Sequence, residues 1–195
     1  MAITYPLATP TSIGIESIEL RAVNSVATSQ SPYTYKQQIV SHGGQKWEAS
    51  VNIPSVRRDL AAGWKAMLVA LKGQEGTFLL GDPDYATPQG TVSSCVITGD
   101  AGNDSVTVVM TGTLKAGDYI QLGSGINSKL HQVLQDQSGN GTLEIWPPLR
   151  STYSSATAVF NSPKGVFRLA NNVTSWSINN ASSYGISFEA VEVIT

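Results

Sequence analysis

Two aspartates, Asp82 and Asp84, flank a proline in the stretch LKGQEGTFLLGDPDYATPQG, residues 71–90. A pair of carboxylates can act as a general acid and base, or it can hold a cation weakly. The same Asp-Pro-Asp order also suits a turn, because aspartate accepts a hydrogen bond from its own backbone and proline fixes φ. We favour the turn, and we interpret the whole stretch as a joint between two structural pieces.

The two histidines and the single cysteine do not form a metal-binding pattern. His42 stands in a Gly-Gly turn, and His131 stands in a predicted strand with no cysteine nearby, so a zinc site is nearly excluded. Cys95 lies in an apolar run and is predicted to be a buried structural thiol. Asp100 to Asp104 offers oxygen ligands without the spacing of a calcium loop, and we interpret it as a hairpin turn.

Two further candidate sites are also better explained by structure. The glycines at Gly73 and Gly76 are not followed by Gly-Lys-Ser/Thr, so they do not form a phosphate loop. Trp146 and Tyr119 could stack on a sugar, but an aromatic residue in a small barrel more often belongs to its core. The sequence therefore predicts no catalytic residue, no metal site and no cofactor, and we expect that the chain is not an enzyme.

The composition indicates a protein that works in an assembly. The 195 residues are 41% hydrophobic, enough for a real core in one ordinary domain or two small ones. Only 13% are charged, about half of the usual share of roughly 25%. A surface this poor in charge suits a protein that is covered by copies of itself or by partners. The scattered Lys and Arg residues argue against nucleic-acid binding, and no signal peptide or membrane span is visible.

The first part of the chain predicts β-strands. Ile18, Leu20 and Ala22 alternate with polar residues, which is the period of a half-buried strand. Residues 33–40 and 46–53 alternate in the same way. Between them, His42-Gly43-Gly44 predicts the tight turn of a hairpin, because glycine accepts positive φ. Pro54 is expected to end the second strand, since proline cannot donate to a ladder.

One helix is predicted after Pro54. Its apolar stripe has helical spacing and must lie on a sheet: Leu60, Trp64, Met67, Leu68 and Leu71. Ser55 or Asp59 favours its start and Gly73 its end. A short buried strand, residues 77–80, should follow.

A second set of strands lies between Gly90 and Asn161. Six short candidates are separated by turn signals: 92–97, 106–110, 117–123, 129–135, 142–146 and 156–160. This spacing predicts a small, closed or partly closed β-barrel. From Pro163 onward the chain again resembles its first part, with candidate strands at 166–169, 174–178 and 186–193.

These elements predict a mainly β fold with an insertion. We expect a β-sandwich with one helix, formed by residues 1–88 and 162–195, and interrupted by a small OB-like barrel of residues 89–161. A domain inserted into a loop needs neighbouring ends, so residues near Gly90 and Asn161 should lie close together. Strands 77–80 and 166–169 should then be neighbours.

Several stretches resemble the distal tail protein family of long-tailed, siphovirus-type bacteriophages. They cover about two thirds of the chain, all outside the inserted barrel: SQSPYTYKQQ at 29–38, GGQKWEASV at 43–51, LKGQEGTFLLGDP at 71–83, PKGVFRL at 163–169, WSI at 176–178 and YGISF at 184–188. These stretches are structural rather than catalytic. The barrel sequence has no such likeness.

The resemblance implies a β-sandwich with a helix that assembles as a homohexameric ring at the tail tip of the virion. Such a ring joins the tail-tube protein to the hub or baseplate and its fibres. It leaves a channel through which DNA passes without specific binding. It also implies assembly in the cytoplasm of the host bacterium, with no membrane partner and an inserted domain that faces outward. Two alternatives stay open: a repeating tail-tube subunit, and a carbohydrate-binding module that touches the host surface.

Overall fold

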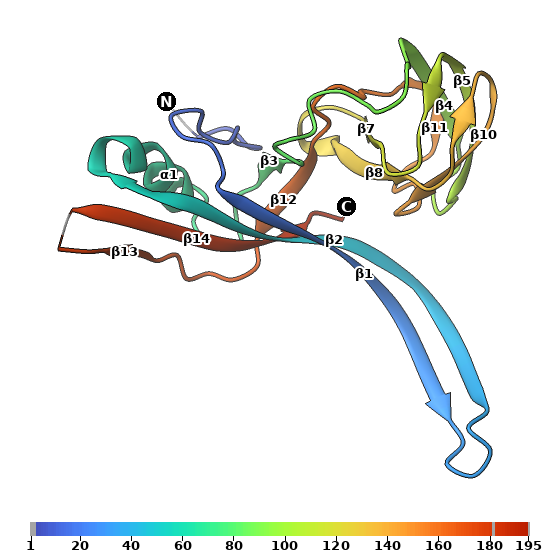
Figure 1. The fold of residues 1–195 in the computed structure, drawn as a ribbon, viewed down its shortest axis with the longest axis horizontal. Helices are drawn as coiled ribbons and strands as arrows, with labels where there is room; N and C mark the ends of the chain where they lie inside the picture. Colours follow the sequence, from blue (N-terminus) through green and yellow to red (C-terminus); the bar gives the residue numbers. More distant parts are fainter. Residues whose placement is uncertain (1–2, 181, 195) are drawn as a thin grey trace.

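A computed structural model describes residues 3–180 and 182–194, so the outer limits of the predicted sandwich, residues 1 and 195, lie outside the described residues. The fold is mainly β with one helix, as predicted. Figure 1 shows a sheet with the helix on one side, a curled sheet beside it, and a long hairpin that extends away from both.

The first sheet contains six strands. Five follow the order β1, β2, β14, β12, β3, and β13 also pairs with β14. Their bounds are β1 Ser17–Gln30, β2 Gln37–Arg57, β3 Phe78–Leu80, β12 Gly165–Leu169, β13 Trp176–Ile178 and β14 Ser183–Glu192. β3 pairs with β12 through Leu79 and Val166, which confirms that strands 77–80 and 166–169 are neighbours.

One face of this sheet is covered by the helix α1, Arg58–Ala70. Trp47, Ala49, Val51 and Ile53 of β2 are buried on that face, which confirms the predicted alternation. Trp64 of α1 is fully buried against them, and its Nε1 donates a hydrogen bond of 3.2 Å to the carbonyl of Ile13. Burial of each large side chain of this kind stabilises the fold by about 1.5–3 kcal/mol.

The hairpin turn is not where the sequence predicted it. β2 runs without a break for 21 residues through His42, Gly43 and Gly44. The register pairs Asn24 with Gln45 and Val26 with Ser41, so residues 42–44 form a bulge opposite Ser25. Gly43 has a φ of 69°, which a bulge accepts as readily as a turn does. The turn itself lies at residues 31–36, where the Ser31 N–H donates to the Lys36 carbonyl.

The end of β2 also differs from the prediction. β2 passes Pro54 and ends at Arg57, where α1 begins, so Ser55 lies in the strand and is not a helix cap. The pairing with β14 shifts between Tyr184 and Ile186, opposite Pro54, and a proline is tolerated at such an irregularity because no ladder donor is needed there. Asp59 does lie in the first helical turn, and Gly73 takes a φ of 69° beyond the last turn.

The second sheet also has six strands, in the order β11, β4, β5, β10, β8, β7. Their bounds are β4 Ser94–Gly99, β5 Ser105–Thr111, β7 Tyr119–Leu122, β8 Lys129–Val133, β10 Gly141–Trp146 and β11 Tyr153–Thr157. β6, Thr113–Leu114, pairs with β9, Gln137–Ser138, and a short 3-10 helix η1 covers Gly125–Asn127. The last predicted strand, 156–160, is displaced toward the N-terminus relative to its expected position.

This second sheet is curled (Figure 1), and the segment that follows one edge strand, β11, meets the other edge strand, β7. Just beyond β11, Val159 exchanges two backbone hydrogen bonds with Gln121 of β7, at 2.7 and 2.9 Å. Its interior forms a separate hydrophobic cluster that includes Cys95, Ile97 and Leu143. The chain enters and leaves this sheet at adjacent points, because the Ser162 N–H donates to the Ala86 carbonyl at 3.1 Å.

Candidate assembly interface

No described part of the chain forms a layer beneath the hairpin of residues 26–41. We call this hairpin the arm. β14 pairs with β2 only between Glu48 and Arg57, so the arm is a ribbon of two strands, β1 and β2. All of its residues are exposed except the half-buried Ser31. Figure 1 shows that it bends away from the rest of the molecule. An isolated two-stranded ribbon is marginally stable in water, so a partner surface is expected to support it.

The arm is rich in exposed apolar and aromatic side chains. Val26, Ile39 and Val40 are 51%, 64% and 46% exposed, and Tyr33 and Tyr35 at the tip are 93% and 73% exposed. Lys36 is the only residue of the arm with a formal charge at neutral pH. Interfaces are poor in charged residues at their centre and rich in tyrosine. The arm therefore has the composition of a contact surface.

The first sheet also has two open edges, judged from residues 3–180 and 182–194. β1 pairs on one side only, with β2, and β13 pairs on one side only, with β14. The third edge, β3, is covered, because Leu7 exchanges two backbone hydrogen bonds of 2.9 Å with Thr77 and Leu79. Open edges present unpaired backbone groups that another strand can bind.

The curled sheet is fixed to the first sheet by a buried polar network. The Arg150 guanidinium lies 2.9 Å from the Glu192 carboxylate and donates a second hydrogen bond of 2.6 Å to the Gln45 carbonyl. Glu192 also accepts a hydrogen bond from the Trp47 backbone N–H. The Lys129 ammonium donates to the Val193 carbonyl at 2.7 Å, and burial lowers the pKa of this lysine. These contacts join residues that are far apart in the chain.

His131 lies fully buried beside this network. Its Nδ1 is 2.7 Å from the carbonyl of Pro147, so Nδ1 must carry the proton and donate it to that oxygen. Its Nε2 has no hydrogen-bond partner among the described residues. Burial lowers the pKa of His131 to about 4, although the bond to Pro147 acts in the opposite direction. His131 is thus a neutral structural histidine.

Asp118 organises the chain between the two sheets, and no sequence pattern pointed to it. This buried carboxylate accepts hydrogen bonds from the backbone N–H groups of Gln89, Gly90 and Lys115, and from the Tyr85 hydroxyl. Partial burial of the Tyr85 hydroxyl raises its pKa. A lone aspartate after glycine is too common a pattern to reveal such a role.

The predicted carboxylate pairs are turn residues. The Asp82 side chain accepts a hydrogen bond of 3.0 Å from the Asp84 N–H, which confirms the predicted turn. Residues 100–104 join β4 to β5, with the Asn103 N–H bonded to the Asp100 carbonyl, which confirms the predicted hairpin. Neither pair is brought together with a histidine, since no group of three or more metal-ligating side chains occurs in the described part of the chain.

The two aromatic residues considered for sugar binding lie between the sheets. The Trp146 ring stands edge-on to the Trp47 ring with their centroids 4.5 Å apart, and the Tyr119 ring lies 6.1 Å from the Trp47 ring. Nε1 of Trp146 donates to the side chain of Asn24 in β1. Both rings are therefore committed to packing. Cys95 is buried as predicted, and burial raises its pKa to about 11.

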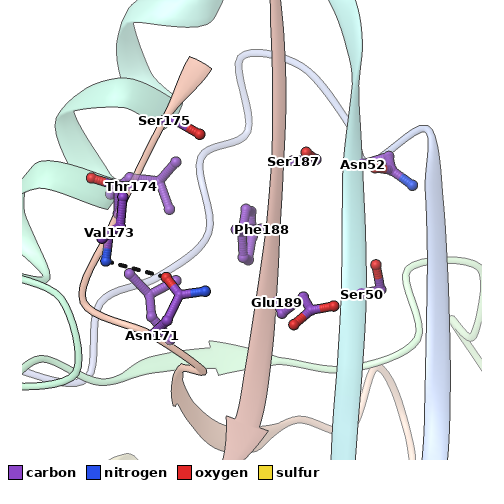
Figure 2. A pocket seen from close by; sticks show the side chains of 11 residues that line it. Ser50, Asn52, Asn171, Val173, Thr174, Ser175, Ser187, Phe188 and Glu189 are labelled. Atoms are coloured by element: carbon purple, nitrogen blue, oxygen red, sulfur yellow. Dashed lines mark hydrogen bonds between the residues drawn. The ribbon is translucent and has the colours of Figure 1, made fainter. Parts of the chain in front are cut away.

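One polar hollow of about 260 Å³ opens beside β14. It lies beside a part of β14 that has no pairing strand on one side. On that side β12 pairs with Ala190 to Glu192 and β13 pairs with Tyr184 to Ile186. Figure 2 shows Phe188 directed from β14 toward residues 171–175, where the Asn171 side chain accepts a hydrogen bond from the Val173 N–H. Serine, threonine and asparagine side chains line most of the rest, together with Leu68 and Leu169, and Glu189 is the one charged lining residue.

No family model and no curated protein matches this chain. Within the described residues, no helix is both long and apolar enough to cross a membrane. The arm and the open edges of the first sheet are its candidate contact surfaces.

Proposed function

We propose that this chain is a structural protein of a phage tail tip, a distal tail protein that assembles into a homohexameric ring. The ring joins the tail tube to the hub or baseplate and its fibres, and it leaves a channel for DNA. The stretches that resemble this family support the proposal, including SQSPYTYKQQ, which forms the end of the arm. The low charged fraction of 13% supports it independently.

The arm is the observation that carries the proposal. It exposes Tyr33, Tyr35 and Ile39 on a ribbon that no other segment within residues 3–180 and 182–194 supports. A monomer would gain little from such an extension, because an exposed, nearly uncharged, two-stranded ribbon is an aggregation hazard. A partner that covers the ribbon removes both the exposed apolar surface and its marginal stability. We infer that the arm is held by a neighbouring copy.

A ring requires two different contact surfaces on each subunit. Head-to-tail contacts close into a ring when the rotation between subunits closes, and they form a filament when it does not. The chain offers two different surfaces of this kind. β1 with the arm forms one edge of the first sheet, and β13, which pairs with β14 on the side away from β2, forms another. These two surfaces differ in length and composition, which suits a head-to-tail contact.

The remaining features support a structural role rather than catalysis. Asp82 is bonded within a turn, His131 is buried in packing, and His42 lies in the exposed bulge of β2. The buried network around Arg150 and Glu192 holds the curled sheet in one position, which suits a rigid projection that contacts other tail proteins. DNA would pass through the channel without specific binding.

A tail-tube subunit is the second candidate, because a long hairpin beside a sheet with one helix would also serve a stacked tube. The carbohydrate-binding alternative is less well supported, since Trp146 and Tyr119 pack on Trp47. Electron microscopy of the purified full-length chain separates the three. We expect single closed rings. Long tubes would favour the tube subunit, and particles that stay monomeric at high concentration would contradict both assembly functions.

A further inference from the structure

The arm joins the rest of the chain at a point where its two strands change register. The register shifts between Asn24 and Val26, so that residues 42–44 of β2 lie opposite Ser25. Two of these three residues are glycines, which have no side chain to restrict backbone rotation, and Gly43 has a φ of 69°. A bulge bends its strand and interrupts the ladder of hydrogen bonds. The bulge is therefore the place where the arm can turn relative to the first sheet.

The curled sheet contacts both strands immediately before this bulge. Nε1 of Trp146 donates a hydrogen bond of 3.0 Å to the Asn24 side chain in β1. The Arg150 guanidinium donates a hydrogen bond of 2.6 Å to the Gln45 carbonyl in β2. Asn24 and Gln45 pair directly across the ribbon. The curled sheet thus holds both strands at one level, at the base of the arm.

Both hydrogen-bond donors are themselves fixed within the curled sheet. Trp146 is the last residue of β10, and its ring packs edge-on to the Trp47 ring. Arg150 lies in the segment between β10 and β11. Its neighbour Leu149 is held by two backbone hydrogen bonds, of 2.7 and 2.9 Å, to the turn at residues 100–104. The two contacts therefore keep the base of the arm in a position that the curled sheet sets.

We propose that the bulge is a hinge and that Trp146 and Arg150 lock it, so that the curled sheet sets the direction of the arm. One contact alone would leave the ribbon free to rotate about the strand that it holds, and contacts on both strands remove this rotation. In the described part of the chain no layer supports the arm, so its direction is fixed only at its base. This inference does not depend on the proposed ring, because it concerns a single chain.

A small rotation at the hinge displaces the tip of the arm by a large distance. At ~3.3 Å per residue, residues 26–31 span about 20 Å. A rotation of about 15° over this length moves the tip by about 5 Å. A contact surface that is held in one orientation binds with a smaller loss of conformational freedom. Trp146 and Arg150 are therefore positioning residues for whatever surface the arm meets.

Distances between two spin labels on the full-length chain test this lock. Ile39→Cys places one label on the arm and Val69→Cys places the other on α1, at positions that are 64% and 58% exposed. The native thiol of Cys95 is fully buried and stays unlabelled in the folded protein. An excess of unlabelled protein ensures that only distances within one chain are measured, whatever the assembly state. Double electron–electron resonance then gives the width of the distance distribution.

Two substitutions weaken the lock, and a third is the matched control. Asn24→Ala removes the contact with β1. Arg150→Lys keeps the positive charge but loses the planar fork that reaches β2 and Glu192 together. Asn52→Ala is the control, because Asn52 also donates an exposed side-chain hydrogen bond, of 3.1 Å to Ser17, within the same two strands but far from the bulge. Circular dichroism establishes that each variant is folded.

We expect the distribution to widen by about twofold in the Asn24→Ala, Arg150→Lys double variant, with smaller increases in the single variants. Asn52→Ala should keep the original width. A second label pair, Glu19→Cys with Val69→Cys, should stay narrow throughout, because Glu19 lies on the other side of the bulge from the arm. A folded double variant with an unchanged width would overturn the lock. Equal widening of the Glu19 pair would overturn the hinge at the bulge.

Discussion

The guanidinium of Arg150 and the carboxylate of Glu192 form a buried ion pair, 2.9 Å apart, that joins the curled sheet to the first sheet. The two side chains are only 9% and 2% exposed. Removal of one partner would leave the other charge buried without compensation, and this is more costly than loss of an exposed pair.

We therefore expect Arg150→Met to lower the free energy of unfolding by about 3–5 kcal/mol in urea denaturation. The double variant Arg150→Met, Glu192→Leu should recover part of this loss, because the carboxylate is then removed together with its guanidinium partner. Lys115→Met, which breaks the exposed pair of Lys115 with Asp136, is the control and should change stability little. An Arg150→Met variant as stable as the control would show that the network does not hold the sheets together.

His131 should make the protein less stable in acid. Burial lowers its pKa to about 4 from the ordinary value of 6.5, so the unfolded chain binds more protons between these two pH values. Stability is lost as pH falls through that window, by about 3 kcal/mol for this group. Urea denaturation at pH 7 and pH 4 should show a smaller difference for His131→Leu than for the wild type. The exposed His42→Asn variant should keep the wild-type difference, and equal pH dependence in all three proteins would refute this assignment.

Asp118 should be required for the order of the segment between the sheets. Asp118→Ala leaves the partly buried N–H groups of Gln89 and Lys115 without an acceptor, at about 1 kcal/mol each. Asp118→Asn keeps one acceptor oxygen but turns an amide N–H₂ toward the donors of the other oxygen, because Gln89 and Lys115 donate to different oxygens, so it should lose about half as much stability. Limited proteolysis within residues 82–90 and denaturant unfolding measure both effects. Wild-type behaviour of the Asn variant would contradict the acceptor role.

Asp82 and Asp84 should be dispensable for chemistry. Asp82→Asn retains a side-chain oxygen that can accept the hydrogen bond from the Asp84 N–H, so unfolding free energies should stay within about 0.5 kcal/mol of the wild type. Titration calorimetry with calcium and magnesium should give no stoichiometric binding in either the wild type or the Asp82→Asn, Asp84→Asn variant. Stoichiometric binding that this double substitution abolishes would establish a metal site and overturn the turn interpretation.

Local patterns in the sequence predicted the elements well where one face is buried. The alternation from Trp47 to Ile53 identified the core face of β2, and the helical spacing around Trp64 identified the face of α1 that packs on it. Hydrophobic period is a local property, so it can be read without knowledge of the partner element. The short strand at 77–80 was predicted from its apolar run between glycines, and its pairing with 166–169 from the close ends that an inserted domain needs.

The errors occurred where one local signal fits two structures. Positive φ at Gly43 is required by a tight turn and by a bulge alike, and only the pairing of Asn24 with Gln45 decides between them. The contacts that fix the curled sheet join residues such as Arg150 and Glu192, which are 42 positions apart. Hydrophobic periodicity, which is a local pattern, cannot predict contacts between residues so far apart in the chain. The arm was also missed, because its exposed apolar residues alternate as a half-buried strand would.

The mass of the particle formed by the full-length chain tests the ring proposal most directly. Sedimentation of the concentrated protein should show a species of six copies of 20.6 kDa, about 124 kDa. A variant in which residues 27–40 are replaced by a short Asn-Gly turn should fold but sediment as a monomer, because the arm supplies the contact. A wild-type chain that remains a monomer at every concentration, or a shortened chain that still forms the six-copy species, would contradict this account.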